Sequence, residues 1–199
     1  MNRLGEALRR CLADLTGRKA SFALVGGLAV SARTEPRFTR DVDVAVAVPG
    51  DPEAEALVRS LSGSGYLVLA QVEQEDTRRL AQVRLVPPGG APEAFVLDLL
   101  FASSGIEPEI VAAADVIEVL EGFRVPVAST GHLLALKVLS FDDRSRPQDR
   151  ADIRALLRTA EASDVETCRR ALGLIGTRGF ARGRKLLEDL EGFLRDGPA

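Results

Sequence analysis

One segment, "RFTRDVDVAVAV" at residues 37–48, most constrains the fold, because it sets two aspartates in a run of valines. Side chains of a strand alternate between its two faces, so Asp41 and Asp43 share one face while the valines share the other. The valine face predicts burial against a core. The polar face continues only with alanines, which leave room above the strand. We therefore expect a strand that is packed on one side and open to chemistry on the other.

A glycine pair precedes this strand, between an apolar run and a short helical pattern. "SFALVGG" at 21–27 predicts a buried strand, and "GLAVSARTE" at 27–35 predicts a helix that begins at the glycines and ends before a proline. Glycines at a helix start let backbone N–H groups approach a phosphate, and the helix dipole favours negative charge there. We predict that Gly26 and Gly27 bind phosphate; the alternative is a tight strand-to-helix turn.

A third carboxylate, Asp98, lies inside the apolar run "AFVLDLLFAS" at 94–103, where an unpaired charge is costly. Three nearby carboxylates would repel one another unless cations neutralise them, and carboxylate oxygens suit Mg²⁺. Two such ions about 3.5–4 Å apart stabilise the attacking and leaving oxygens of a phosphoryl transfer. The sequence thus predicts that Asp41, Asp43 and Asp98 hold Mg²⁺, with two ions expected.

Simpler explanations exist for the aspartates of the first segment. Asp41 could pair with Arg37 or Arg40, and Asp43 could be a solvated residue on an edge strand. Arg40 is close in sequence to the carboxylates, and on that ground we predict that it contacts the nucleotide.

The rest of the chain divides into a mixed part and a helical part. We expect an amphipathic helix over 1–17, a helix after an Asp51 N-cap, a hairpin of 66–74 with 78–87, a loop at 87–93, a mostly helical 108–120, an extended 123–129, and helices from 130 on with Ser129 or Thr130 as N-cap. The predicted fold is α/β (α+β), with a mixed β-sheet. The predicted domains are 1–128 and a helical C-terminal region at 129–199, with the active site between them.

Charge and cysteine content limit the classes of partner and the cellular compartment that we expect. The net charge of −3 gives no overall attraction to nucleic acid, so an RNA partner would need a local basic patch. "GTRGFARGRKLLEDL" at 176–190 could supply one, although a solvated helix face explains it equally simply. Cys11 and Cys168 have no partners at metal-ligand spacing, and neither a signal peptide nor a membrane-length apolar run is visible. We expect a reduced, cytoplasmic protein that does not enter a membrane.

Five segments in this order resemble a known group: "LVGGLAV", "RFTRDVDVAV", "FVLDLLFAS", "ASTGHLLALKVLSF" and "QDRADIRALL". The pattern is similar to the nucleotidyltransferase superfamily with a polymerase-β-like palm, and more narrowly to the AbiEii/AbiGii-type nucleotidyltransferase toxins. The resemblance covers roughly residues 21–157. It implies that Lys137 binds a nucleotide phosphate and that Asp149 or Asp152 orients this lysine or acts as a general base. From the residues alone, these three could equally form an ordinary salt bridge between packed helices.

The resemblance also implies a reaction. An acceptor hydroxyl or phosphate would attack the α-phosphate of an NTP, with Mg²⁺ present and pyrophosphate released. The acceptor would be the tRNA 3′ end, and the protein would be the toxin of a toxin–antitoxin pair with a cognate antitoxin as partner. Two alternatives are a small-molecule, antibiotic-type nucleotidyltransferase and a non-catalytic nucleotide-binding or regulatory module of the same fold. We assign no role to His132, the single histidine.

Overall fold

The computed structural model describes residues 3–35, 39, 41–90, 95–142 and 147–197. Its helices are α1 (Arg3–Gly17), α2 (Gly26–Arg33), α3 (Asp51–Gly63), α4 (Glu107–Ala112), α5 (Thr130–Ser140), α6 (Pro147–Thr159), α7 (Ala162–Thr177) and α8 (Leu186–Asp196). Its strands are β1 (Ser21–Val25), β2 (Asp41–Ala47), β3 (Leu67–Glu73), β4 (Leu80–Val86), β5 (Val96–Leu100), β6 (Asp115–Leu120) and β7 (Phe123–Val127). Arg40, and part of the loop predicted at 87–93, lie outside the described residues.

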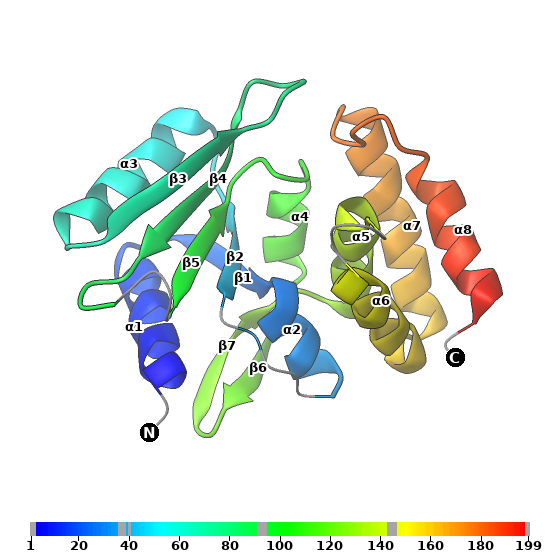
Figure 1. The fold of residues 1–199 in the computed structure, drawn as a ribbon, viewed down its shortest axis with the longest axis horizontal. Coiled ribbons are helices and arrows are strands. Elements are labelled where there is room, and N and C mark those ends of the chain that lie inside the picture. The colour runs from blue at the N-terminus through cyan, green and yellow to red at the C-terminus, as the bar shows by residue number, and fades with distance from the viewer. Residues whose placement is uncertain (1–2, 36–38, 40, 91–94, 143–146, 198–199) are drawn as a thin grey trace.

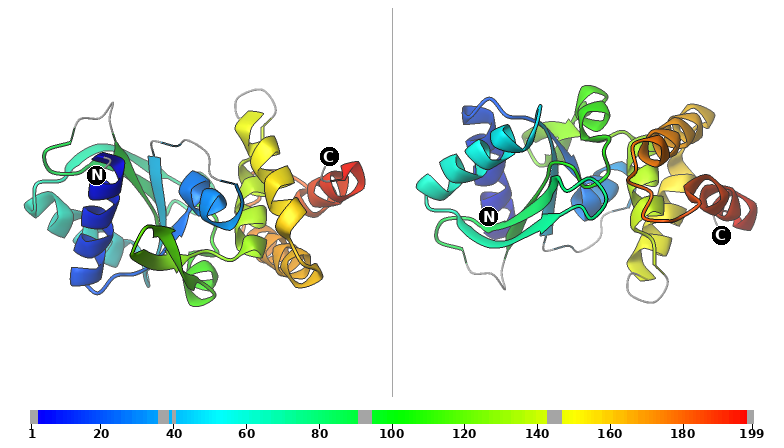
Figure 2. Two further views of the ribbon diagram at one scale, coloured as in Figure 1. Left: turned by 90° about the horizontal axis from the view of Figure 1, so that it is seen from below. Right: turned by 90° about the horizontal axis from the view of Figure 1, so that it is seen from above.

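The strands form a seven-stranded sheet in the order β3-β4-β5-β2-β1-β7-β6 (Figure 1). The sheet is mixed, as predicted: β2 runs parallel to β5 and antiparallel to β1. Helices α1 and α3 lie on one side of the sheet and the C-terminal helices on the other, as both views of Figure 2 show. The last strand ends at Val127 and α5 begins at Thr130. The domain division at 128/129 stays a prediction.

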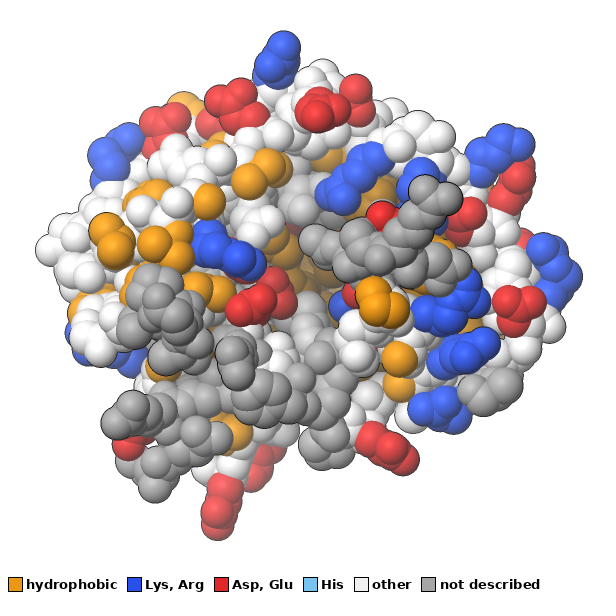
Figure 3. Space-filling view, in the orientation of Figure 1, with side chains coloured by type: hydrophobic (Ala, Val, Ile, Leu, Met, Phe, Trp, Pro, Cys, Tyr) orange, Lys and Arg blue, Asp and Glu red, His pale blue; other side chains and the backbone are white. Residues whose placement is uncertain are grey.

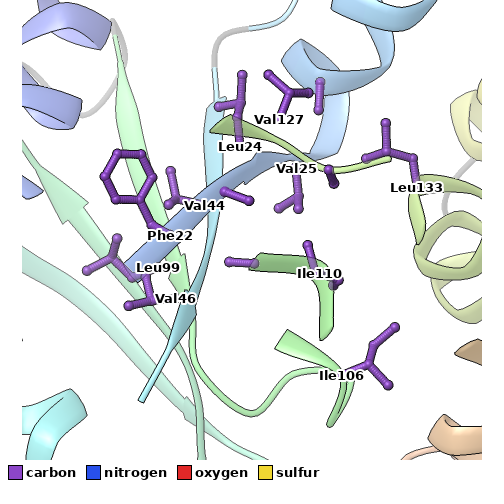
Figure 4. Close-up of a cluster of buried hydrophobic side chains, with 14 of the residues drawn as sticks. Phe22, Leu24, Val25, Val44, Val46, Leu99, Ile106, Ile110, Val127 and Leu133 are labelled. Atoms are coloured by element: carbon purple, nitrogen blue, oxygen red, sulfur yellow. The ribbon is translucent and has the colours of Figure 1, made fainter. Parts of the chain in front are cut away.

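The core depends on the valine face of β2. Val42, Val44 and Val46 are buried, and Val44 lies opposite the buried Leu99 of the neighbouring parallel strand. Figure 4 shows that Leu133, at the start of α5, lies near this group of apolar side chains. Since Leu133 belongs to the same buried cluster, one continuous core joins the sheet to the helical region. The polar face of β2 is thereby held in a fixed position relative to α5.

The prediction that 108–120 is mostly helical was wrong in its second half. Helix α4 ends at Ala112, and Asp115–Leu120 forms β6, which pairs antiparallel with β7. The segment "DVIEVL" is rich in β-branched residues, which favour a strand once a partner is present. That partner lies just beyond Gly122, so the missed signal was a hairpin.

Asp51 is not the N-cap that the sequence suggested. The cap position is Gly50, and Asp51 is the first residue of α3. Its carboxylate instead accepts hydrogen bonds from the Arg79 side chain and the Leu80 backbone N–H, at 3.2 and 3.1 Å. The Asp51 side chain therefore contacts the start of β4 and does not cap α3. Ser129 does cap α5, as predicted, because its side chain accepts a hydrogen bond from the His132 N–H.

None of the helices in the described part of the chain combines the length and apolarity that crossing a bilayer requires.

Gly131 marks a close approach of α5 and α7. A Cβ at Gly131 would lie 2.5 Å from the Asp164 carbonyl oxygen and 2.7 Å from the Thr167 Cβ. We expect Gly131→Ala to lower the free energy of unfolding by about 1–3 kcal/mol, measured by urea denaturation. The matched control is Gly173→Ala in α7, where a new Cβ meets nothing within 4 Å, and where a gain of about 0.4–1 kcal/mol is expected. Equal effects of the two substitutions would contradict the close approach.

Candidate active site

The three predicted strand carboxylates share one face of the sheet. Asp43 of β2 lies directly opposite Asp98 of β5, and Asp41 lies two residues earlier on β2. Their exposures differ: the Asp41 side chain is 50% exposed, whereas Asp98 is 2% exposed. The parallel pairing of β2 with β5 therefore brings together residues that are more than fifty positions apart in sequence.

Arg84 of β4 compensates the buried charge of Asp98. It lies opposite Asp98 in the β4–β5 register, and its Nε and Nη2 donate to the two carboxylate oxygens at 2.9 and 2.6 Å. The same Nη2 is 3.8 Å from Asp41. The sequence analysis missed this arginine. An arginine in the strand pattern at 78–87 was visible, but its partner depends on a strand pairing that the local sequence does not specify.

Asp43 has no such partner. Among the described residues, no hydrogen bond or ion pair reaches its carboxylate. Burial, and then the negative charges of Asp98 and Asp41, raise the pKa of the Asp43 carboxyl to about 6, while Lys137 and Arg84 act in the opposite direction. A partly buried carboxylate beside two others is a group that a cation would stabilise.

The three strand carboxylates fit Mg²⁺ only in part. Asp41 and Asp43 offer carboxylate oxygens, the ligands that Mg²⁺ prefers. Asp98 already has both oxygens bonded to Arg84. In the described part of the chain, no three His, Cys, Asp or Glu side chains are arranged as a metal-binding group. A single ion on Asp41 and Asp43 is the arrangement that these contacts fit directly.

The glycine pair lies against Asp43. Gly26 has a φ of +65°, and a Cβ on this residue would overlap the Asp43 carboxylate. A side chain at position 26 is thus excluded both by the backbone conformation and by the space. Helix α2 begins here, and no side chain of the N-cap residue, Val25, bonds to its first N–H groups. Phosphate binding by Gly26 and Gly27 stays a prediction, and a helix start without a side-chain cap is compatible with it.

Lys137, Asp149 and Asp152 form a compact ionic group between α5 and α6. The Lys137 ammonium is 2.7 Å from Asp149 and 2.8 Å from Asp152. Both aspartates are buried, and Ser140 donates a hydrogen bond to the second oxygen of Asp149 at 2.8 Å. The lysine and the D-x-x-D pair, identified through the resemblance, do come together. Two of the three ammonium donors are engaged, which leaves one for a further acceptor.

A cleft of about 970 Å³ joins these groups. Its lining includes Gly26, Asp43 and Arg84 from the sheet side and Lys137 and Asp149 from the helices. Figure 3 shows this face of the molecule hollowed between the strand-bearing half and the C-terminal helices. The connection between β3 and β4 adds exposed acidic side chains to the rim, namely Glu73, Glu75 and Asp76.

The arginine run at 176–190 contacts both α5 and the part of the chain around α4. Arg178 forms an ion pair with Glu109 at 2.6 Å, and Arg184 donates to the carbonyls of Val138, Leu139 and Phe141. Arg182 is different, because it lines the cleft. Neither the RNA-binding patch nor the plain solvated face describes this segment. His132 is buried beside its cap residue, with Nδ1 2.8 Å from the Ser129 hydroxyl.

Comparison with known families matches this chain over residues 7–196 to the model of the nucleotidyl transferase AbiEii toxin, a type IV toxin–antitoxin system. The chain belongs to the AbiEii nucleotidyltransferase toxin family. It is therefore a transferase of nucleotidyl groups, and the family predicted from its motifs is confirmed. Comparison with curated proteins gave no match.

Several solved structures are similar to this AbiEii-family protein. The lincosamide antibiotic adenylyltransferase LnuA, with lincomycin bound, has 15% identity and a TM-score of 0.50, covering 78% of this chain and 97% of its own. A nucleotidyltransferase-like antigen of Paracoccidioides brasiliensis has 21% identity and a TM-score of 0.49, covering 90% and 88%. The toxin MenT4 of Mycobacterium tuberculosis has 15% identity and a TM-score of 0.34, covering 86% and 84%. The likeness to LnuA shows a nucleotidyltransferase fold, which confirms the predicted fold class.

The raised pKa of Asp43 predicts a pH-dependent stability. The folded protein binds the Asp43 proton more tightly than the unfolded chain does, so ionisation destabilises the fold as the pH rises from 3.8 to about 6. We expect Asp43→Asn, in metal-free buffer, to raise Tm relative to the natural protein at about pH 7.5 and to change it little at about pH 4. Thermal unfolding followed by circular dichroism measures both. A shift of equal size at the two pH values would contradict the perturbed carboxyl.

The ionic group between α5 and α6 predicts a large effect of removing its cation. Lys137→Met removes the cation that contacts two buried carboxylates, so we expect a loss of about 3–5 kcal/mol in the free energy of unfolding. Adding Asp149→Asn and Asp152→Asn removes those charges and should recover most of the loss. Urea denaturation compares the natural protein with these two variants. A Lys137→Met protein of unchanged stability would show that the aspartates do not depend on the lysine.

Proposed function

We propose that this protein transfers a nucleoside monophosphate from an NTP to an acceptor in a Mg²⁺-dependent reaction, in the cytoplasm and as the toxin of a toxin–antitoxin pair. One observation carries the proposal. Gly26 lies against Asp43 on one wall of the cleft, and Lys137 lines the same cleft from the other wall. An anion-binding helix start, carboxylates suited to a metal and a fixed cation meet there. This combination suits a triphosphate and its metal ion.

Residues on both walls would bind the triphosphate. The uncapped N–H groups at the start of α2 can donate to phosphate oxygens, and the dipole of α2 favours their charge. On the opposite wall, the remaining N–H donor of Lys137 would bond the same triphosphate and bring a full positive charge to it. Asp149 and Asp152 hold this ammonium in place, so little freedom is lost when the nucleotide binds.

Asp41 and Asp43 would hold the metal. A bound Mg²⁺ supplies charge stabilisation to the phosphate at which substitution occurs. Asp43 contributes a carboxylate that no described side chain neutralises, and its proximity to Gly26 places it beside the phosphate-binding amides. We therefore assign to Asp41 and Asp43 a cation that would also contact phosphate.

Of the two helix aspartates, Asp149 is the better candidate for contact with the acceptor. Asp149 lines the cleft, whereas Asp152 is 1% exposed and does not. We assign Asp152 to positioning Lys137. Asp149, which bonds both Lys137 and Ser140, would accept the proton of the attacking hydroxyl.

The match to a toxin of a toxin–antitoxin system supports an antitoxin as the protein partner. The tRNA 3′ end, which the resemblance of the motifs implies, is the first acceptor to test. A second acceptor class is favoured by the acidic rim of Glu73, Glu75 and Asp76. These charges repel phosphates and attract amines, so a small cationic molecule that carries a hydroxyl group also suits the cleft.

The deciding experiment supplies each α-³²P-labelled NTP with Mg²⁺ and total tRNA. We expect label in tRNA from one preferred NTP, reduced at least about 100-fold in Asp43→Asn because a metal ligand is lost. Asp115→Asn, on the edge strand β6 with a 60%-exposed side chain, is the matched control and should retain activity.

A parallel reaction replaces tRNA by small hydroxyl-bearing amines. Label confined to these amines would support the second acceptor class against tRNA. An absence of both labelling and NTP binding by calorimetry would rule out the transferase proposal.

A further inference from the structure

The contacts of Asp98 differ from those expected of a metal ligand. The sequence predicts two Mg²⁺ ions on three aspartates, but both oxygens of Asp98 accept hydrogen bonds from Arg84. Asp98 lines the cleft, but only 2% of its surface is exposed. An ion would therefore have to compete with the guanidinium for a carboxylate that is almost wholly buried.

We propose that this enzyme holds one divalent cation, on Asp41 and Asp43, and that the guanidinium of Arg84 permanently takes the place of a second cation at Asp98. The inference rests on the proposed function, because it specifies the metal content of the same site. Arg84 is thereby a positioning residue of the metal site, which the sequence pattern did not reveal.

The sheet itself holds Arg84 in this place. Arg84, Asp98 and Asp43 are directly opposite one another on three adjacent strands, β4, β5 and β2. Their backbone positions are fixed by the ladder, so the pairing does not depend on a mobile loop. A cation placed by strand register is present in every molecule, whatever the concentration of metal.

The chemistry of the pair favours permanence. A guanidinium presents a planar set of donors that matches a carboxylate with two parallel hydrogen bonds, and it stays charged at every physiological pH. The Asp98 side chain is 2% exposed, so moving the guanidinium away would leave a buried charge uncompensated, although the Arg84 side chain itself is 41% exposed. Displacement by a second Mg²⁺ would have to overcome that cost.

Arg84 also fits the remaining single-ion site. Its Nη2 is 3.8 Å from Asp41, which places a positive charge beside one of the two proposed metal ligands without occupying it. One guanidinium and one divalent ion together match the charge of the three carboxylates. Asp43, which no described cation contacts, remains available for the ion.

Metal stoichiometry tests the proposal independently of activity. Mn²⁺ is titrated into protein saturated with a non-hydrolysable α,β-methylene ATP analogue, and free Mn²⁺ is followed by electron paramagnetic resonance. We expect one bound Mn²⁺ per chain in both the natural protein and Asp98→Asn. In Asp43→Asn the affinity should fall by more than about tenfold, because a direct ligand is removed.

Arg84→Gln is the complementary variant. It frees the carboxylate of Asp98, so the stoichiometry should rise to two, and it should return to one when Asp98→Asn is added. Circular dichroism confirms that each variant is folded. This pair of variants also serves if Asp98→Asn alone fails to fold.

Two ions in the natural protein, with one lost in Asp98→Asn, would overturn the inference and restore the two-ion site. A folded Arg84→Gln that still binds one ion would also overturn it, since Arg84 would not be what excludes the second. No Mn²⁺ above that held by the free analogue would instead count against the proposed metal-dependent function. The failures of the two proposals are thereby distinguishable.

Discussion

Carboxylates placed on one face of a packed sheet are the constraint on which the rest of this structure depends. Parallel pairing of β2 with β5 brings Asp43 directly opposite the buried Asp98. Such an arrangement persists only where other groups offset the repulsion. Arg84 does so for Asp98 through the next strand, and Asp43 is left with a raised pKa. The uncompensated carboxylate is the one that lies against Gly26, for which we propose phosphate binding.

In the helical region the arrangement of charges is different, because one cation lies between two carboxylates. There a single cation, Lys137, lies between two buried aspartates, so the ammonium is held firmly and its position is determined from two sides. The continuous core through Leu133 then fixes the distance between this cation and the sheet carboxylates. In the proposed function, a triphosphate would use both a fixed cation and a place for a metal. The two walls of the cleft would supply these separately.

The sequence predicted the parts of this site whose signals are local. Alternation located Asp41 and Asp43 on the open face of β2, and the glycine pair located the start of α2, because both patterns depend only on neighbouring residues. The same reasoning missed β6, whose strand character appears only when it pairs with β7. It also missed Arg84, because one arginine among the many in this chain becomes significant only through the β4–β5 register. Lys137 with its two aspartates came from the resemblance, since residues on separate helices carry no joint signal of their own.

Charge around the cleft bears on which acceptor can enter it. Glu73, Glu75 and Asp76 form an acidic rim, and the net charge of −3 adds no attraction for RNA at long range. A tRNA could present its 3′ end only if the phosphates farther along the strand avoided that rim. Arg154 and Arg158 lie four residues apart on α6, the helix that carries Asp149, and their positive charges would attract the phosphates of an RNA acceptor. An RNA acceptor would therefore have to approach from the side of the C-terminal helices, whereas a cationic small molecule could enter past the rim. The direction of approach, rather than the chemistry at the phosphate, is what separates the two acceptor classes.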